Sequence, residues 1–261
     1  MTWRRVGLWV VVGHALLAVV VPWLPLASVS EQEPGQVLKG VSSRHLLGTD
    51  HLGRDLLART LWGGRPSIGT ALAAVVAAVL LGFLIGMASA MASGWIGDLL
   101  MRVNDLLLAL PSLLVLMLVA SFVGRQTWVL VLTLALMYAP PIARVVRGAS
   151  MSVLARDFVV AARMRGAGPV EIVVGEVLPN IRRVVLTEAG MQFSWILLAF
   201  SSLSFLGLGA NPPTPEWGLM IAESRTFMTI NPLPVVAPIV MLASLVLAVN
   251  SLVDRSGGAS A

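Results

Sequence analysis

The run GTALAAVVAAVLLGFLIGMASAMAS, from Gly69 to Ser93, carries no charged side chain and decides the fold class. A helix needs about 20 mainly apolar residues to cross the hydrocarbon layer of a bilayer, and this run is long enough. Over the whole chain 57% of residues are hydrophobic and 12% are charged, whereas roughly a quarter of residues are charged in soluble domains. The sequence therefore predicts an integral membrane protein.

Five further apolar runs are separated from this one and from each other by polar breaks. They lie at Val6–Val29, Asp105–Gly124, Thr127–Ala143, Val184–Gly207 and Leu233–Leu252. The first follows two arginines, but it is long and no small-residue cleavage site closes it, so we interpret it as an uncleaved anchor and not a secretory signal. We expect an all-α, polytopic membrane protein of about six transmembrane helices.

Arginines set the expected orientation, because short loops rich in Lys and Arg stay in the cytoplasm. The loop between the fourth and fifth runs holds seven arginines and three acidic residues, so we place it inside, and six crossings then put both termini in the cytoplasm. The segment 30–66 would face outside. Its four arginines count against the rule, although four acidic residues accompany them.

This outer segment contains two features that predict its local structure. Gly48, Gly53, Gly63 and Gly64 predict turns. Leucines at helical spacing predict a short amphipathic helix lying on the outer membrane surface, formed by Leu52, Leu56, Leu57 and Leu61.

Small residues recur every four positions in the second run, at Gly82, Gly86, Ala90 and Gly94. Lipid tails are as apolar as leucine side chains, so the hydrophobic effect does not hold membrane helices together. Small residues let the helix backbones approach closely and pack instead. The ridge fits packing within this chain or an interface with another subunit. Pro111 is expected to kink the third run, and the Pro140–Pro141 pair to kink or end the fourth.

The cytoplasmic loop reads RDFVVAARMRGAGPVEIVVGEVLPN from Arg156 to Asn180. We expect a helix to Arg165, a stop at Gly166 and a second short helix opened by Pro169. Leu178 and Pro179 are expected to end that second helix. Two short helices joined by a glycine turn could be gripped by a soluble partner, or could lie as a basic loop against anionic headgroups.

Several kinds of site are missing from the sequence. No phosphate-binding loop of the G-x-x-x-x-G-K-[ST] type is present, and the single lysine is Lys39. There is no cysteine, and the histidines His14, His45 and His51 define no common ligand face, so we expect no metal site. The formal charge of +5 fits cytoplasmic arginines better than nucleic-acid binding.

Ala161, Ala162, Gly166 and the Leu178–Pro179 pair resemble the EAA loop of binding-protein-dependent ABC importer permeases. Val160 stands where that motif has its glutamate, and Glu176 where a branched apolar residue is usual. Two stretches, HLLGTDHLGRDLLARTLWGGRPS (His45–Ser67) and SLSFLGLGANPPTPEWGLMIAESR (Ser202–Arg225), resemble the C-type permeases of dipeptide, oligopeptide and nickel importers. The resemblance runs from about His45 to the last span.

The resemblance implies an N-terminal helix (1–29), an extracytoplasmic segment (30–66) and a permease domain (67–255) with a cytoplasmic coupling loop (148–183). It implies no enzymatic activity and no bound cofactor, because two cytoplasmic ATPase subunits would bind the ATP. The other expected partners are a second, homologous permease, an extracytoplasmic solute-binding protein and membrane lipid, in the bacterial cytoplasmic (inner) membrane. The loop residues would couple ATPase closure to the membrane helices.

The cargo expected from this resemblance is a di- or oligopeptide, with nickel or a metal chelate as the alternative. A stand-alone secondary transporter is the rival from another class, but the sequence shows no inverted repeat and no charged residues near the bilayer midplane. Of the ionisable residues near or within spans, Asp105, Arg125 and Glu188, we expect the two acids to be exposed at the headgroup level. Trp217 is expected to anchor at the membrane interface.

Overall fold

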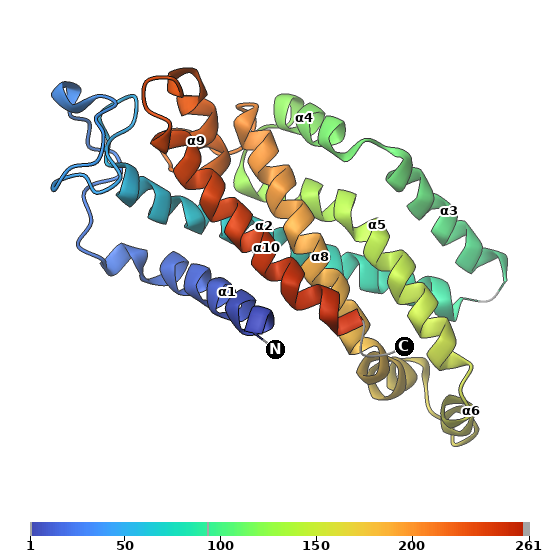
Figure 1. Cartoon of the computed structure of the whole chain (residues 1–261). Coiled ribbons are helices and arrows are strands. Elements are labelled where there is room, and N and C mark those ends of the chain that lie inside the picture. The colour runs from blue at the N-terminus through green and yellow to red at the C-terminus, as the bar shows by residue number, and fades with distance from the viewer. Residues whose placement is uncertain (1, 93, 258–261) are drawn as a thin grey trace.

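The computed structural model describes residues 2–92 and 94–257, and the described part is built from helices with no strand. Five helices are long and apolar enough to cross a membrane, or six if one bent pair is a single span. The predicted all-α architecture of about six spans is therefore confirmed. The long helices run side by side in a tilted bundle (Figure 1).

The long helices are α1 (Thr2–Val20), α2 (Leu56–Met91), α5 (Thr127–Leu154), α8 (Leu178–Phe205) and α10 (Leu233–Gly257), with the bent pair α3 (Trp95–Ala109) and α4 (Ser112–Phe122). The short helices are η1 (Val21–Trp23), η2 (Pro34–Gln36), α6 (Asp157–Met164), α7 (Pro169–Glu171), the π-helix η3 (Ile172–Val177), α9 (Trp217–Ser224) and η4 (Arg225–Phe227).

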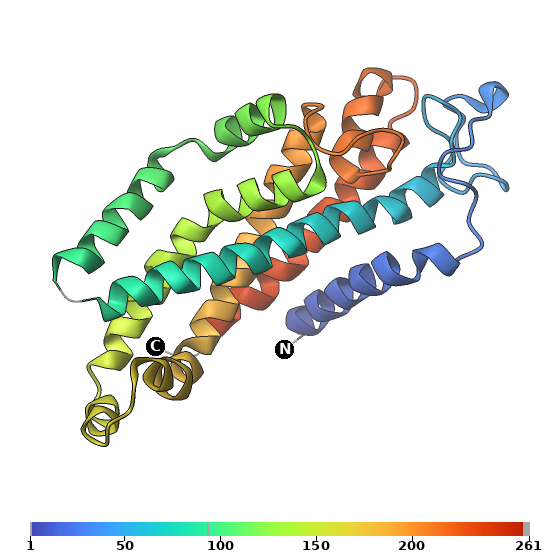
Figure 2. The ribbon, with the colours of Figure 1, turned by 180° about the vertical axis from the view of Figure 1, so that it is seen from behind.

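The centre of the bundle is the contact between α2 and α5, which lie side by side in both views (Figures 1 and 2). The buried face of α2 consists of small residues at helical spacing, Ala71, Ala74, Ala78, Gly82 and Gly86. Helix α8 packs on both α2 and α5, and α10 packs on α8. Helix α1 lies at the edge, against α10 and α2.

The second span begins earlier than the sequence indicates, so the expected boundary at 66/67 falls inside α2. Asp55 caps the helix by accepting a hydrogen bond from the Ala58 N–H (2.7 Å). Leu56, expected in a surface helix, belongs to the first turn of α2 and is buried. Gly63 and Gly64 do not form turns, because they are helical residues packed against the Trp217 side chain.

The third predicted span is broken. Helices α3 and α4 meet at 79° around Pro111, with a break of two residues between Ala109 and Ser112. Proline cannot donate a backbone hydrogen bond, and it restricts the residue before it to an extended conformation, which Leu110 adopts. The result is an angled element laid against α5, with a short α4 that is apolar apart from Ser112 and Ser121.

Pro140 and Pro141 do not end the fourth span, because α5 continues through them to Leu154. Pro140 is buried, and its carbonyl oxygen accepts a hydrogen bond from Asn104 Nδ2 of α3 (3.1 Å). Packing on α2 and α3 supports the helix where the local sequence would allow it to stop. The first span is shorter than expected: α1 ends at Val20, and the 3₁₀ turn η1 carries the chain to Trp23.

Candidate functional site

A knob formed by α6, α7 and η3 projects beyond one end of the bundle, next to the C-terminal end of α5 and the N-terminal end of α8 (Figure 1). Its inward-facing side chains fix it to the bundle: Val159, Ala162, Ile172 and Val177 are all buried. Ala161 is half-buried beside them. The knob is therefore a packed part of the fold and not a loose loop.

Gly166 shapes the turn of the knob. It adopts φ +91°, a conformation that side chains with a Cβ rarely take. The Ala167 N–H donates to the Ala162 carbonyl (3.1 Å), and the Gly166 N–H donates to the Arg163 carbonyl (2.9 Å). This is the Schellman pattern that ends helices with a glycine. The predicted stop after α6 and the restart at Pro169 are both present.

Leu178 and Pro179 lie at the start of α8 and not at the end of the second short helix, where they were expected. They do not end the second short helix, because α7, η3 and α8 follow one another without a break from Pro169 to Phe205. Pro179 has no N–H to donate to the preceding turn, and the turn before it widens into the π-helix η3. The second half of the knob is thus the N-terminal end of a long, apolar helix.

The free surface of the knob is apolar at its centre. Met164 and Val170 are 79% and 76% exposed, and Val174 is 59% exposed. Arg163 and Arg165, which flank Met164 in the sequence, are exposed as well. An exposed apolar patch with a polar rim is typical of a protein-binding surface.

The small-residue ridge lies inside this chain over its first half. A Cβ on Gly82 would lie 2.7 Å from both the Ala139 carbonyl oxygen and Ile142 Cβ of α5, and Gly86 approaches α5 in the same way. Ala90 is half-buried. The ridge does not reach Gly94, because α2 ends at Met91 and Gly94 is an exposed turn residue at φ +57° before α3.

At the opposite end, a network of charged residues that the sequence analysis did not single out joins the outer segment to α9. Arg54 Nε lies 2.6 Å from Asp50 Oδ2 and Arg54 Nη2 lies 2.9 Å from Glu223 Oε2. Arg59 Nε lies 3.3 Å from Asp50, and Arg59 Nη1 donates to the Val29 carbonyl (2.9 Å). Burial of these ions requires such pairing, and it fixes α9 against the start of α2.

Trp217 is not an interfacial anchor as expected but is fully buried. Its indole N–H donates to the Thr60 carbonyl (2.9 Å), and its ring fills the notch left by the glycines of α2. The preceding Glu216 accepts from Ser67 Oγ (2.9 Å) and from the Leu219 N–H (2.9 Å). Burial raises the pKa of the Glu216 carboxyl above its ordinary value.

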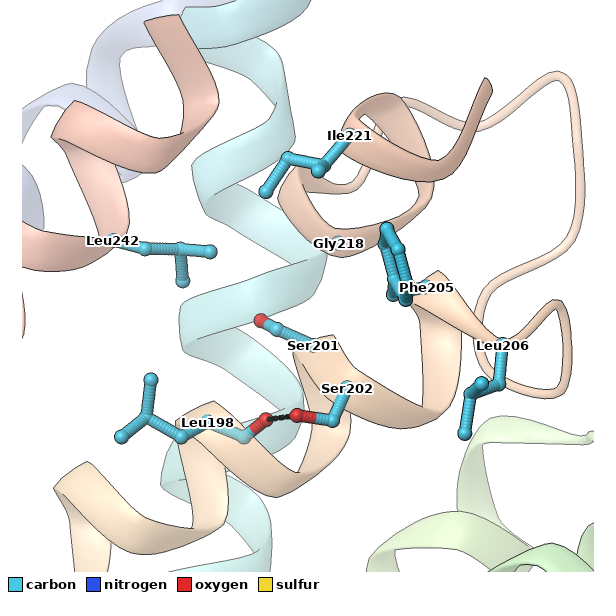
Figure 3. A pocket seen from close by; sticks show the side chains of 8 residues that line it. All are labelled: Leu198, Ser201, Ser202, Phe205, Leu206, Gly218, Ile221 and Leu242. Carbon is cyan, nitrogen blue, oxygen red and sulfur yellow. Dashed lines mark hydrogen bonds between the residues drawn. The ribbon is translucent and has the colours of Figure 1, made fainter. Parts of the chain in front are cut away.

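An open pocket of about 320 Å³ lies where α8, α9 and α10 meet, at the end of the bundle opposite the knob (Figure 3). Its walls are apolar apart from two serines, and Ser202 Oγ donates to the Leu198 carbonyl (2.7 Å), so that hydroxyl already has a partner. The lining residues are Leu198, Ser201, Ser202, Phe205, Leu206, Gly218, Ile221 and Leu242.

The histidines lie in three separate contacts. His14 Nε2 is 3.3 Å from Ser244 Oγ, His45 Nδ1 is 2.8 Å from Asp55 Oδ2, and His51 stacks on Phe227 with ring centroids 5.7 Å apart. Within the described residues no three possible metal ligands gather.

The ionisable residues of the spans differ in their surroundings. Asp105 is exposed, as expected, and pairs with Arg144 (2.7 Å). Arg125 is exposed and donates to the Gly207 carbonyl (2.7 Å). Glu188 is not exposed at the headgroup level but buried, because it lies on the face of α8 that packs into the bundle.

Residues 78–257 match the family model described as "Binding-protein-dependent transport system inner membrane component". The chain belongs to this family. The family description and the five or six candidate spans make it a multi-pass permease subunit of the cytoplasmic membrane.

Named relatives resemble this permease over most of its length. The di/tripeptide transport system permease protein DppC of Pseudomonas aeruginosa is 37% identical over 217 residues, covering 81% of this chain and 72% of the relative. The dipeptide transport system permease protein DppC of Alkalihalophilus pseudofirmus is 32% identical over 249 residues, with coverage of 95% and 82%. The glutathione transport system permease protein GsiD of Shigella dysenteriae is 37% identical over 215 residues, with coverage of 82% and 71%.

Among solved structures, a chain of the MetNI methionine ABC transporter superposes on this permease with a TM-score of 0.63. The match covers 78% of this chain and 95% of the MetNI chain, at 18% sequence identity. It shows that the two chains share their fold.

Proposed function

We propose that the chain is the permease subunit of an ATP-driven importer that moves di- or oligopeptides across the cytoplasmic membrane. The cargo class is supported by relatives named for di/tripeptide, dipeptide and glutathione transport. The mechanism is supported above all by the knob of α6, α7 and η3, a packed projection whose exposed centre is apolar. The chain lacks a phosphate-binding loop of its own, so a separate ATPase subunit would have to bind the ATP. That subunit would dock on the knob.

The knob transmits force directly to the membrane. Its second half is continuous with α8, so a displacement of Val170 by a closing ATPase moves the long helix that begins at Pro169. Ala161 and Ala162 allow α6 to lie close to the bundle, Gly166 sets the angle between α6 and α7, and Leu178–Pro179 set the π-helical joint. In this mechanism two ATPase subunits bind the ATP, and the permease itself performs no chemistry and holds no cofactor.

A second, homologous permease would face the exposed stripe of α8. Met191, Trp195, Leu198 and Ser202 follow one another at spacings of three or four residues and are all exposed. Such a stripe forms one face of a helix. The pathway would lie between the two permeases and open alternately to either side as the knobs move.

The outer segment and α9 would receive the extracytoplasmic solute-binding protein. They lie at the end of the bundle opposite the knob (Figure 1). With the knob in the cytoplasm, both termini are cytoplasmic as well.

Cargo is tested by uptake of a labelled dipeptide and of radioactive nickel in cells with and without this chain, with the ATP supply intact. Loss of dipeptide uptake alone supports the proposal. Loss of nickel uptake alone keeps the ATP-driven mechanism but assigns a metal cargo, and unchanged uptake of both contradicts the proposal.

Orientation and ATPase docking are tested with single cysteines, because the natural chain has none. Met164→Cys lies on the knob and Val41→Cys on the outer segment, at positions 79% and 67% exposed. A membrane-impermeant maleimide should label Val41→Cys in intact cells and Met164→Cys only after permeabilisation. Met164→Cys should also cross-link to the ATPase subunit, and the reverse labelling pattern would contradict the orientation.

A further inference from the structure

Glu188 is a buried carboxyl that has no cationic partner among the side chains that the structure describes. It is 7% exposed on α8, within a candidate membrane span. Among the side chains that the structure describes, its one hydrogen-bond partner is Gln192, whose Nε2 donates to Glu188 Oε1 at 2.7 Å, and it takes part in no ion pair. Carboxyl groups inside membrane spans are rare, and they often line substrate or ion pathways.

The contact with Glu188 fixes how the Gln192 amide points. Its NH₂ group is engaged by the carboxylate, so its carbonyl oxygen remains as an acceptor, and no described group donates to it. Gln192 is itself 7% exposed, and it lines a pocket of about 260 Å³. A side chain with a free acceptor therefore lines this cavity.

The rest of this pocket suits a cation with an apolar neighbour. Tyr138 and Trp195 contribute aromatic rings, Leu110 lies in the break between α3 and α4, and Ser112 begins α4. Aromatic faces attract ammonium groups, more strongly where water is excluded. Trp195 is 61% exposed, so the pocket opens onto the face of α8 that the proposed function assigns to the pathway.

We propose that this pocket is a transit subsite for the terminal ammonium group of a peptide. Gln192 accepts a hydrogen bond from the ammonium, the rings of Tyr138 and Trp195 flank it, and Glu188 acts as a positioning residue that supplies the compensating negative charge. This inference rests on the proposed function, since it places the cargo on the pathway between two permeases.

The test measures equilibrium binding to the assembled transporter without its solute-binding protein. The probes are a dipeptide with a free amino terminus and the same dipeptide with an acetylated one. The wild-type complex should bind the free-amine dipeptide at least tenfold more tightly, because a hydrogen bond to a charged group contributes about 1.5–3 kcal/mol. Equal binding of the two dipeptides, or binding of neither, overturns the inference.

Two variants test whether the preference for the free amine depends on the negative charge of Glu188 or only on its hydrogen bond with Gln192. Glu188→Gln keeps an oxygen for the Gln192 NH₂ group, so it should leave the melting temperature unchanged while removing the preference for the free amine. Leu186→Met, at an exposed residue of the same helix outside the stripe, is the matched control and should keep that preference. A Glu188→Gln complex that still prefers the free amine contradicts the role of the carboxylate.

ATP-driven dipeptide uptake by the wild-type complex with its solute-binding protein is measured in parallel. If uptake occurs but the preference is missing, the subsite is wrong and the proposed function stands. If no uptake occurs, the proposed function fails.

Discussion

Replacing Gly82 by alanine tests the close packing of α2 on α5. The added methyl group would lie 2.7 Å from the Ala139 carbonyl oxygen and from Ile142 Cβ, whereas ordinary contacts begin at 3.4 Å. Helix α2 would have to move away by about 0.7 Å, or the side chains around it would have to rearrange. Overpacking of this kind costs about 1–3 kcal/mol.

The intrinsic preference of the helix opposes this cost, because alanine is favoured over glycine by about 1 kcal/mol in a helix interior. Gly69→Ala provides the matched control. Gly69 is exposed on the same helix, and a methyl group there would meet nothing within 4 Å. Both variants gain the same helix preference. The difference between their unfolding free energies therefore reports the clash alone. We expect Gly82→Ala to be less stable than Gly69→Ala by about 1–3 kcal/mol.

The assay is denaturant-induced unfolding of the purified full chain in one detergent, followed by circular dichroism. We expect Gly69→Ala to unfold at a higher denaturant concentration than the wild-type chain, and Gly82→Ala at a lower concentration than Gly69→Ala. If the two variants unfold at the same concentration, the helices do not touch at Gly82, and the reasoning about the ridge is refuted.

Two further variants probe the outer segment. Burial lowers the pKa of His51 below its usual 6.5, so the folded state binds fewer protons than the unfolded state, and stability should fall as the pH drops from 6.5 through the lowered pKa. His51→Phe, which keeps the stack on Phe227, should reduce this loss between pH 7.5 and 5.5 in thermal unfolding, and an equal loss in both proteins would contradict the prediction. Arg59→Met should destabilise the chain by roughly 3 kcal/mol in denaturant unfolding, the low end for a broken buried pair because a second arginine still pairs with Asp50. Arg44→Met, at an exposed pair, should cost at most about 1 kcal/mol, and equal effects of the two variants would argue against the buried network.

The spans were predictable because composition alone identifies them. The last span begins at Leu233 as expected, and the stop at Gly166 and the start at Pro169 follow from backbone preferences that act within a few residues. Such local signals do not depend on what the helix packs against.

The errors arose where packing overrides local preference. Pro140 was expected to kink or stop its helix, and the helix does not stop there, because the contacts of α5 with α2 and α3 support it. Trp217 was expected at the interface because tryptophan is common there, yet two glycines about two helical turns into α2 make a notch that buries it. The pairing of Glu188 with Gln192 follows helical spacing (i, i+4) and could have been found from the sequence.

The coupling role of the knob is tested most directly by placing valine at each of its two turn glycines. Gly166 has φ +91°, where a β-branched residue costs about 1–3 kcal/mol, whereas Gly168 has φ −76° and ψ 166°, which valine adopts readily. A methyl group would meet no neighbour within 4 Å at either position.

The measurement is ATP-driven dipeptide uptake by the assembled importer, together with ATPase subunit retained on the purified permease. The account predicts that Gly166→Val weakens ATPase binding by roughly 5- to 150-fold, the range that 1–3 kcal/mol of coupling free energy represents, and reduces uptake accordingly, while Gly168→Val behaves like the wild type. Equal uptake and equal ATPase retention in the two variants would contradict the claim that this turn couples the ATPase to the membrane helices.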